Sequence, residues 1–228
     1  MASTAALGYD DLPDLLTLLT GDEKHDRSSF STLDVLWVLY DRVLWVDPRA
    51  PDAPDRDRFL LSKGHGPAAY YAVLAAKGFI PVSWLESFGT GGSALGYHPD
   101  RMLVPGVEIS SGSLGHGLPI AVGVALGLDA RDAEEPRVIC LLGDAELEEG
   151  SNFEAIQLAG RLGLGRLTVV VVDNASSTHG WPAGIERRFE LEGWSAVRVD
   201  GRDHDALEHA FLAGGRGRPH AVVAEVRE

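Results

Sequence analysis

Two oxygen-bearing side chains, each placed one residue beyond an apolar run, could do chemistry together in this 228-residue chain. Asp144 follows the run 138–142 and a glycine, and Asn174 follows the run 167–172 and an aspartate, thirty positions after the acid. Short, β-branched apolar runs of this kind predict buried parallel strands. In open parallel sheets, ligands bind beyond the carboxyl ends of the strands, so both side chains are predicted to face one site.

A carboxylate, an amide oxygen and a free backbone carbonyl suit a hard cation such as Mg²⁺ or Ca²⁺, which usually bridges to a phosphate group. The pattern therefore predicts a metal–diphosphate site. A simpler interpretation stays open for either pair taken alone: Gly143-Asp144 as a strand-end turn, and Asp173-Asn174 as a helix or turn cap. The occurrence of both pairs on neighbouring strands favours the site.

The segment between the two runs is predicted to be a helix, so that one βαβ unit carries both donors. Ser151 and Glu154 form the S-x-x-E pattern of a capping box, and apolar residues follow at helical spacing. Four readable strands, separated by helix-length segments, predict a doubly wound parallel sheet. The other expected elements are a lead-in helix within 1–24, helices over 33–45 (capped by Ser31), 68–77, 118–128 and from Asp205 to Leu212, a helix begun by Ser83 and Glu86, and strands over 196–199 and 221–226.

Length and composition bound the class of protein. The 45% hydrophobic content is enough for one large α/β domain over 1–228. The net charge of −14 argues against nucleic acid and anionic membrane as partners, because both need concentrated Lys and Arg. Cys140 is the single cysteine and lies in a predicted strand, which fits a reducing cytoplasm. Neither a signal peptide nor a membrane span is predicted.

Two glycine-rich turns are candidates for binding phosphate or a cofactor. His65 lies in the turn 63–67, beside the predicted start of a helix at Pro67, where exposed N–H groups favour phosphate. A lone histidine in a turn is more often a surface hydrogen-bonding residue. The turn 110–117, SSGSLGHG, has glycines that let backbone approach a ligand closely. It could equally be the lead-in to the helix over 118–128, and both interpretations can hold.

These motifs resemble those of a known family. Gly143-Asp144, then Glu149-Gly150, then Asn174 resembles the thiamine diphosphate motif of transketolases, which is GDG, a downstream EG, a helix, a strand and an Asn. Segments 55–66, 96–117 and 158–167 resemble the same family in the same order, and the resemblance covers nearly the whole chain. It implies a three-layer α/β/α thiamine-diphosphate-binding fold with a mainly parallel sheet, present here as one diphosphate-binding (PP-type) domain over 1–228.

The resemblance also implies residue roles. His25, His65 and His98 would lie near the substrate carbonyl and hydroxyls, where imidazoles suit general acid–base work. The metal, Mg²⁺ or Ca²⁺, would be held by Asp144, Asn174 and the carbonyl of Ser176. The diphosphate would contact His65 and backbone near Ala145, the thiamine pocket would include backbone at Gly112 and Leu114, and Glu149 would lie in a carboxylate network at a subunit interface.

The implied activity is transfer of a two-carbon ketol unit from a ketose to an aldose, with sugars or sugar phosphates as substrates. In this family a glutamate on a separate pyrimidine-binding domain activates the cofactor. That domain and the C-terminal domain are absent from these residues, so the resemblance implies a partner subunit carrying them, with two copies of each chain. The sequence thus resembles the N-terminal subunit of a two-chain transketolase.

Departures from the family pattern keep alternatives open. Ala145 replaces the middle glycine of GDG, which is tolerated if its φ is negative. A catalytically silent scaffold subunit therefore remains an alternative, as does another thiamine diphosphate enzyme, such as a ketoacid dehydrogenase component or deoxyxylulose-phosphate synthase. A nucleotide-binding oxidoreductase is disfavoured because no G-x-G-x-x-G follows the first strand. Charged residues at 24–27 and polar ones at 176–179 suggest a specialised substrate.

Overall fold

A five-stranded, all-parallel sheet forms the middle layer of the molecule. The computed structural model describes residues 7–19, 26–64, 67–133, 135–215 and 217–226. The strand order is β1-β2-β3-β5-β4. The strands are β1 (Arg58–Leu61), β2 (Val138–Gly143), β3 (Leu167–Asp173), β4 (Ser195–Asp200) and β5 (His220–Glu225).

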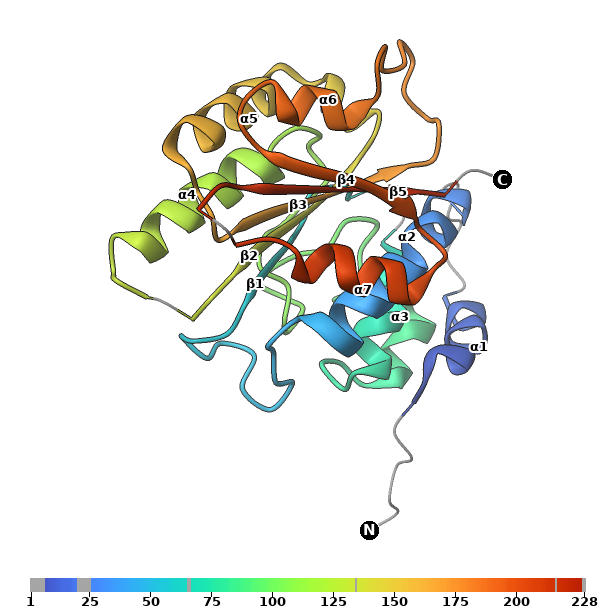
Figure 1. Ribbon diagram of the computed structural model, residues 1–228. Coiled ribbons are helices and arrows are strands. Elements are labelled where there is room, and N and C mark those ends of the chain that lie inside the picture. Colours follow the sequence, from blue (N-terminus) through green and yellow to red (C-terminus); the bar gives the residue numbers. More distant parts are fainter. Residues whose placement is uncertain (1–6, 20–25, 65–66, 134, 216, 227–228) are drawn as a thin grey trace.

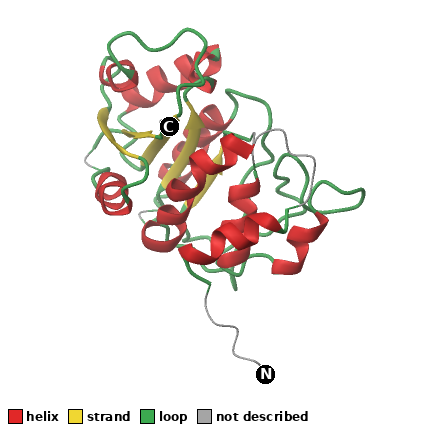
Figure 2. Cartoon of the chain, turned by 90° about the vertical axis from the view of Figure 1, so that its right-hand side faces the viewer, coloured by secondary structure: helices red, strands yellow, loops and turns green. Residues whose placement is uncertain are grey.

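Helices cover both faces of this sheet, which confirms the three-layer α/β/α prediction (Figures 1 and 2). On one face lie α4 (Gly117–Asp129), α5 (Gly150–Leu162) and α6 (Ile185–Glu190). On the other lie α1 (Leu12–Thr17), α2 (Asp26–Val38), α3 (Ala68–Ala76) and α7 (His204–Leu212). Shorter helical turns are the 3-10 helices Tyr9–Asp11, Val82–Ser87 and Glu146–Glu148 and a π-helical turn, Leu39–Val43. No helix in the described ranges is both long and apolar enough to cross a membrane.

The alternation of side chains along β2 explains the two cores. Ile139 and Leu141 pack with α2, α3 and α7, whereas Cys140 and Leu142 pack with α4 and α5. All six residues of β2 and all seven of β3 are buried, as expected for central parallel strands. The predicted strands and the helix over 118–128 are confirmed to within one or two residues.

One strand escaped the sequence interpretation, which counted four. β1 is only four residues long and pairs with β2 from Arg58 opposite Val138 to Leu61 opposite Leu141. Charged residues precede β1 and a polar turn follows it, so its apolar run is too short to predict a strand.

The residues predicted to cap four helices do not cap them. α2 begins at Asp26, so Ser31 lies inside it, and α-helical geometry ends at Val38 instead of Trp45. The segment expected to be a capped helix from Ser83 is a 3-10 helix that follows Pro81. Tertiary packing decides these boundaries, and a local capping pattern carries no information about that packing.

The other two predicted capping residues each lie two positions after the residue that occupies the N-cap. Ser151 does not cap α5; its hydroxyl donates to the carbonyl of Gly115 at 2.7 Å, and Glu149 is the N-cap residue without a side-chain bond. At α7 the cap is Asp203, whose carboxylate accepts from the backbone N–H groups of Asp205 and Ala206. Asp205 itself lies in the first turn.

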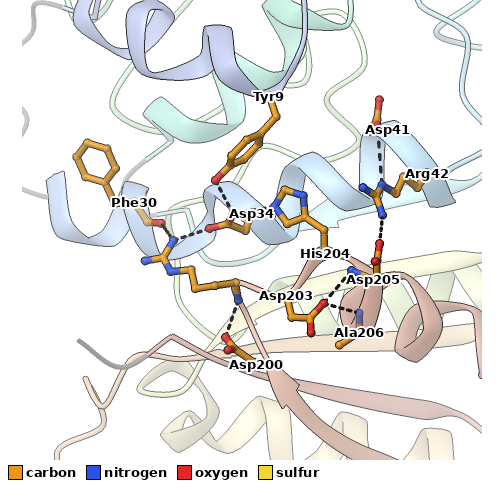
Figure 3. Close-up of polar contacts among 11 residues, drawn as sticks. Tyr9, Phe30, Asp34, Asp41, Arg42, Asp200, Asp203, His204, Asp205 and Ala206 are labelled. Carbon is orange, nitrogen blue, oxygen red and sulfur yellow. Dashed lines mark hydrogen bonds and ion pairs between the residues drawn. The ribbon is translucent and has the colours of Figure 1, made fainter.

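A buried carboxylate joins the start of the described chain to the loop before α7 (Figure 3). Asp34, on α2, is 5% exposed and accepts hydrogen bonds from the Tyr9 hydroxyl, from Arg202 and from Nε2 of His204 at 2.8 Å. Burial alone would raise the pKa of Asp34, but these three donors lower it below its ordinary value. This cluster fixes α2 and the Tyr9–Asp11 turn against the segment that follows β4.

Candidate functional site

The predicted acid and amide lie at the carboxyl edge of two neighbouring strands. β2 and β3 pair in parallel with Gly143 opposite Val172, and the N–H of Asp144 donates to the carbonyl of Val172 at 3.1 Å. Asp144 is 1% exposed. Its carboxylate accepts from the Ser176 hydroxyl and from the N–H of Ser177 at 3.0 Å. The loop after β3 therefore folds back onto Asp144, as the sequence predicts for a shared site.

Asn174 presents an unsatisfied oxygen in this loop. Its Oδ1 is buried and has no hydrogen-bond partner among the described residues. An unpaired buried acceptor costs about 1–3 kcal/mol, a cost that a ligand supplying a cation or a hydrogen-bond donor would remove. The following residue, Ala175, has φ of 57°, in the left-handed region that non-glycine residues rarely adopt.

The donor set fits a hard cation. Among the described residues, no group of three or more His, Cys, Asp or Glu side chains is placed to hold a metal ion. A metal at this edge would thus combine one carboxylate, from Asp144, with amide and backbone oxygens, from Asn174 and Ser176. This is the kind of oxygen set that Mg²⁺ and Ca²⁺ use when a phosphate completes the coordination.

Next to Asp144 lies a cavity of about 180 Å³ between the loop after β3 and the start of α6. The indole Nε1 of Trp181 donates to the carbonyl of Asp144 at 3.3 Å on its rim. Arg198 in its wall is paired with Asp173, Glu186 and Glu225, so its charge is matched within the protein. The cavity is lined by Asp144, Asp173, Ala175, Ser177, Gly180, Trp181, Gly184, Ile185 and Arg198.

Three motif segments that are separate in the sequence meet in space. Nδ1 of His98 lies 2.9 Å from the carbonyl oxygen of Gly64. Because a carbonyl only accepts, Nδ1 donates, which fixes the orientation of the ring. Gly112 has φ of 127°, and a Cβ there would lie 2.8 Å from Cγ of His98. A Cβ on Gly64 would lie 2.6 Å from the backbone nitrogen of Gly112, so both contacts require glycine.

The remaining predicted residues are placed as follows. His25 and His65 lie outside the described residues. Ala145 has φ of −67° at the start of the Glu146–Glu148 turn, so replacing glycine there introduces no backbone strain. Leu114 and Glu149 are exposed, and Glu149 precedes α5.

Two charged residues that the sequence interpretation did not single out are buried at this site. Lys63 is 7% exposed, and its stem packs against Gly143. Burial lowers the pKa of Lys63 to about 8, although the carboxylates of Asp144 and Glu146 act in the opposite direction. Glu146 is 2% exposed, and burial raises its pKa, against the effect of hydrogen bonds from Ser62, Gly115 and Gly143. For Glu146 the available signal was its place shortly after the predicted strand 138–142, whereas Lys63 follows β1, the strand that was not predicted.

Comparison with known proteins agrees with this geometry. Residues 19–225 match the family model described as transketolase, thiamine diphosphate binding domain. The chain belongs to the transketolase family. Solved transketolases share the fold: the enzyme from Leishmania mexicana superposes with a TM-score of 0.80 at 26% identity over 97% of this chain, and the R525L mutant from Pichia stipitis with 0.83 at 26% identity over 95%.

Relatives of this transketolase chain include separate subunits. It is 35% identical over 207 residues to an apulose-4-phosphate transketolase subunit of Actinobacillus succinogenes, covering 88% of this chain and 75% of that one. It is 56% identical over 218 residues to a protein of Rhodococcoides fascians named ferredoxin fas2, covering 96% of this chain and 72% of that one. By contrast, it spans 31% of transketolase 2 of Xanthobacter flavus and 37% of the Leishmania enzyme. The chain is therefore a homologue of the N-terminal, thiamine-diphosphate-binding subunit of two-chain transketolases.

Proposed function

We propose that this chain is one subunit of a two-chain transketolase that transfers a two-carbon ketol unit from a ketose to an aldose, using thiamine diphosphate and a divalent metal ion. The observation that carries the proposal is that the buried Asp144 carboxylate and the buried, unsatisfied Oδ1 of Asn174 follow directly after β2 and β3, two strands that pair in parallel.

The residues would divide the work as follows. Asp144, Asn174 and the carbonyl of Ser176 would hold Mg²⁺ or Ca²⁺. Backbone at Ala145, together with His65, would contact the diphosphate. When bound, the cofactor supplies the electron sink that stabilises a two-carbon carbanion, a capacity that protein side chains lack.

Proton handling would fall to imidazoles. His98, whose Nδ1 donates to the carbonyl of Gly64, is proposed to act as the general base toward a sugar hydroxyl. His25 and His65 are proposed to act on the same substrate. The backbone of Gly112 and Leu114 would line the cofactor pocket, and the contact between Gly112 and His98 supports a shared location for pocket and imidazole.

The partner is proposed from the relatives' division into subunits. Two relatives named as transketolase subunits are each matched over 75% of their length, which supports a second polypeptide carrying the pyrimidine-binding domain and its activating glutamate. Two copies of each chain are proposed, with Glu149 near the interface and sugars or sugar phosphates as substrates. The free, buried thiol of Cys140 suits a reducing cytoplasm.

Two other functions have less support. A silent scaffold role was suggested by Ala145, but its negative φ removes the strain on which that alternative depended. The name of the Rhodococcoides relative suggests electron transfer, yet these 228 residues contain one cysteine, whereas iron–sulfur clusters take four cysteine ligands, or two with two histidines. That name is therefore not carried over to this chain.

The test is Asp144→Asn in the complex co-purified with its partner subunit. Calorimetry with thiamine diphosphate and Mg²⁺ should show uptake by the wild type and its loss in the variant, together with loss of two-carbon transfer across a panel of ketoses and aldoses. Asp200→Asn is the matched control, an exposed acid at the end of β4 on the same sheet edge. Normal uptake by Asp144→Asn would refute the ligand assignment, and no Mg²⁺-dependent uptake by the wild type would refute the function.

A further inference from the structure

Glu146 is a buried acid that the proposed reaction does not use directly. One carboxylate oxygen, Oε1, accepts from the hydroxyl of Ser62 and from the N–H of Gly115 at 2.9 Å. The other, Oε2, is 3.4 Å from the N–H of Gly143. The carboxylate therefore holds three segments at once: the turn after β1, the glycine turn before α4 and the end of β2.

The hydrogen bonds continue into the start of α4. The hydroxyl of Ser62 donates to Glu146 and accepts from the N–H of Gly117 at 3.0 Å, which uses the hydroxyl in both of its roles. A Cβ on Gly117 would lie 2.2 Å from Cβ of Ser62, so the turn and the helix are in direct contact. On the other side, a Cβ on Gly115 would lie 2.6 Å from Cβ of Glu149.

Charge also favours a carboxylate at this position. Glu146 is 2% exposed, and a buried carboxylate is tolerated only when it is hydrogen-bonded and compensated. The hydrogen bonds are those described above, and the nearby ammonium of Lys63 opposes the rise that burial causes in the pKa of Glu146. Lys63 in turn packs on Gly143, the residue before Asp144.

We infer that Glu146 is a positioning residue, whose carboxylate fixes the backbones of Gly115, Gly117 and Gly143 in the arrangement that receives the diphosphate cofactor. The inference rests on the proposed function, since these backbones belong to the segments that carry the predicted cofactor contacts at Gly112, Leu114 and Asp144. The carboxylate of Glu146 is hydrogen-bonded to Ser62, Gly115 and Gly143, so it acts through these groups. Its loss would leave three buried donors without an acceptor and let the segments move independently.

The test uses two substitutions of Glu146 that differ in which of its hydrogen bonds they keep. Glu146→Ala removes every bond. Glu146→Gln keeps Oε1 as the acceptor for Ser62 and Gly115, and it loses the weak contact to Gly143 and the charge opposite Lys63. Removing a residue that orients binding groups typically lowers affinity about 10- to 100-fold, so the Ala variant should bind thiamine diphosphate with Mg²⁺ that much more weakly. The Gln variant should stay within about tenfold of the wild type.

Two controls separate positioning from general loss of stability. Leu128→Ala removes a buried side chain at the opposite end of α4 and should lower the melting temperature without changing cofactor affinity. Glu154→Gln changes an exposed acid on α5 and should change neither. Should Glu146→Ala fail to fold, Ser62→Ala takes its place, because it removes the same link between the carboxylate and Gly117.

A second readout needs no cofactor. Amide hydrogen exchange of the full chain should show protection at Gly115 and Gly117 falling about tenfold or more in the Ala variant and staying near the wild type in Leu128→Ala. Normal cofactor affinity in Glu146→Ala at equal folded fraction, or unchanged protection at Gly115, would overturn the inference. A wild-type complex that binds no thiamine diphosphate would instead refute the proposed function, and the exchange data would still decide whether Glu146 holds these segments.

Discussion

The unsatisfied oxygen of Asn174 predicts opposite effects of one substitution on the empty and the loaded protein. Leucine has nearly the same shape as asparagine but no polar atoms, so Asn174→Leu removes the buried acceptor that has no partner among the described residues. That acceptor costs about 1–3 kcal/mol. In a chain of this size each kcal/mol corresponds to roughly 2–4 °C in melting temperature, so the variant should melt about 2–12 °C higher without ligand.

The loaded protein should show the reverse. A ligand present at 100 times its dissociation constant stabilises the folded state by about 2.7 kcal/mol, which raises the melting temperature of the wild type by roughly 5–10 °C. Without the amide oxygen of Asn174, the variant should lose most of this rise at the same concentrations of Mg²⁺ and thiamine diphosphate. The assay is scanning calorimetry of the co-purified complex, with and without both ligands.

Asn152 provides the contrast. Its Oδ1 is also buried without a partner among the described residues, but its Nδ2 donates to the carbonyl of Glu146 at 2.7 Å. Asn152→Leu breaks that bond and should therefore melt lower than the wild type without ligand. The reasoning about Asn174 would be refuted if its leucine variant melted lower without ligand, or if it kept the full ligand-induced rise.

Three further predictions concern the fold. Gly160→Ala places a Cβ 1.8 Å from the carbonyl oxygen of Glu192 and should cost at least about 2 kcal/mol in urea unfolding, whereas Gly123→Ala on α4 meets nothing within 4 Å and should be neutral or stabilising. The lowered pKa of Asp34 contributes stability above its unfolded pKa of about 3.9 that is lost as pH falls through the folded pKa, so Asp34→Asn should melt lower than the wild type at pH 7 and lose that difference in acid. Burial lowers the pKa of His220, so the unfolded chain takes up its proton first, near pH 6.5; stability should fall below that pH, and less steeply in His220→Gln.

The centre of the fold was predictable because its signals are local and strong. β2 and β3 are continuous apolar runs that end in Gly-Asp and Asp-Asn, and parallel pairing brings such ends together without further information. The shared edge for Asp144 and Asn174 followed from that. Their roles as metal ligands, and those of the predicted histidines, stay predictions.

The rest depended on partners far away in the sequence. Ser151 has the pattern of a cap, but the carbonyl of Gly115, 36 positions earlier, takes its hydroxyl. Glu146 lies in a run of acids that suggests a solvated turn, and only the fold brings Ser62 and Gly115 to its carboxylate. Since a pattern in one segment says nothing about the segment opposite, these contacts could not be predicted from spacing.

The strand order has a consequence for biosynthesis. β5, at residues 220–225, is inserted between β3 and β4, so the last of the five described strands to leave the ribosome is an interior one. Until it emerges, β3 exposes its pairing edge and β4 has no neighbour in the sheet. The nascent chain must therefore complete this sheet after translation of the β5 segment, and stop codons only a few positions upstream would yield aggregation-prone fragments.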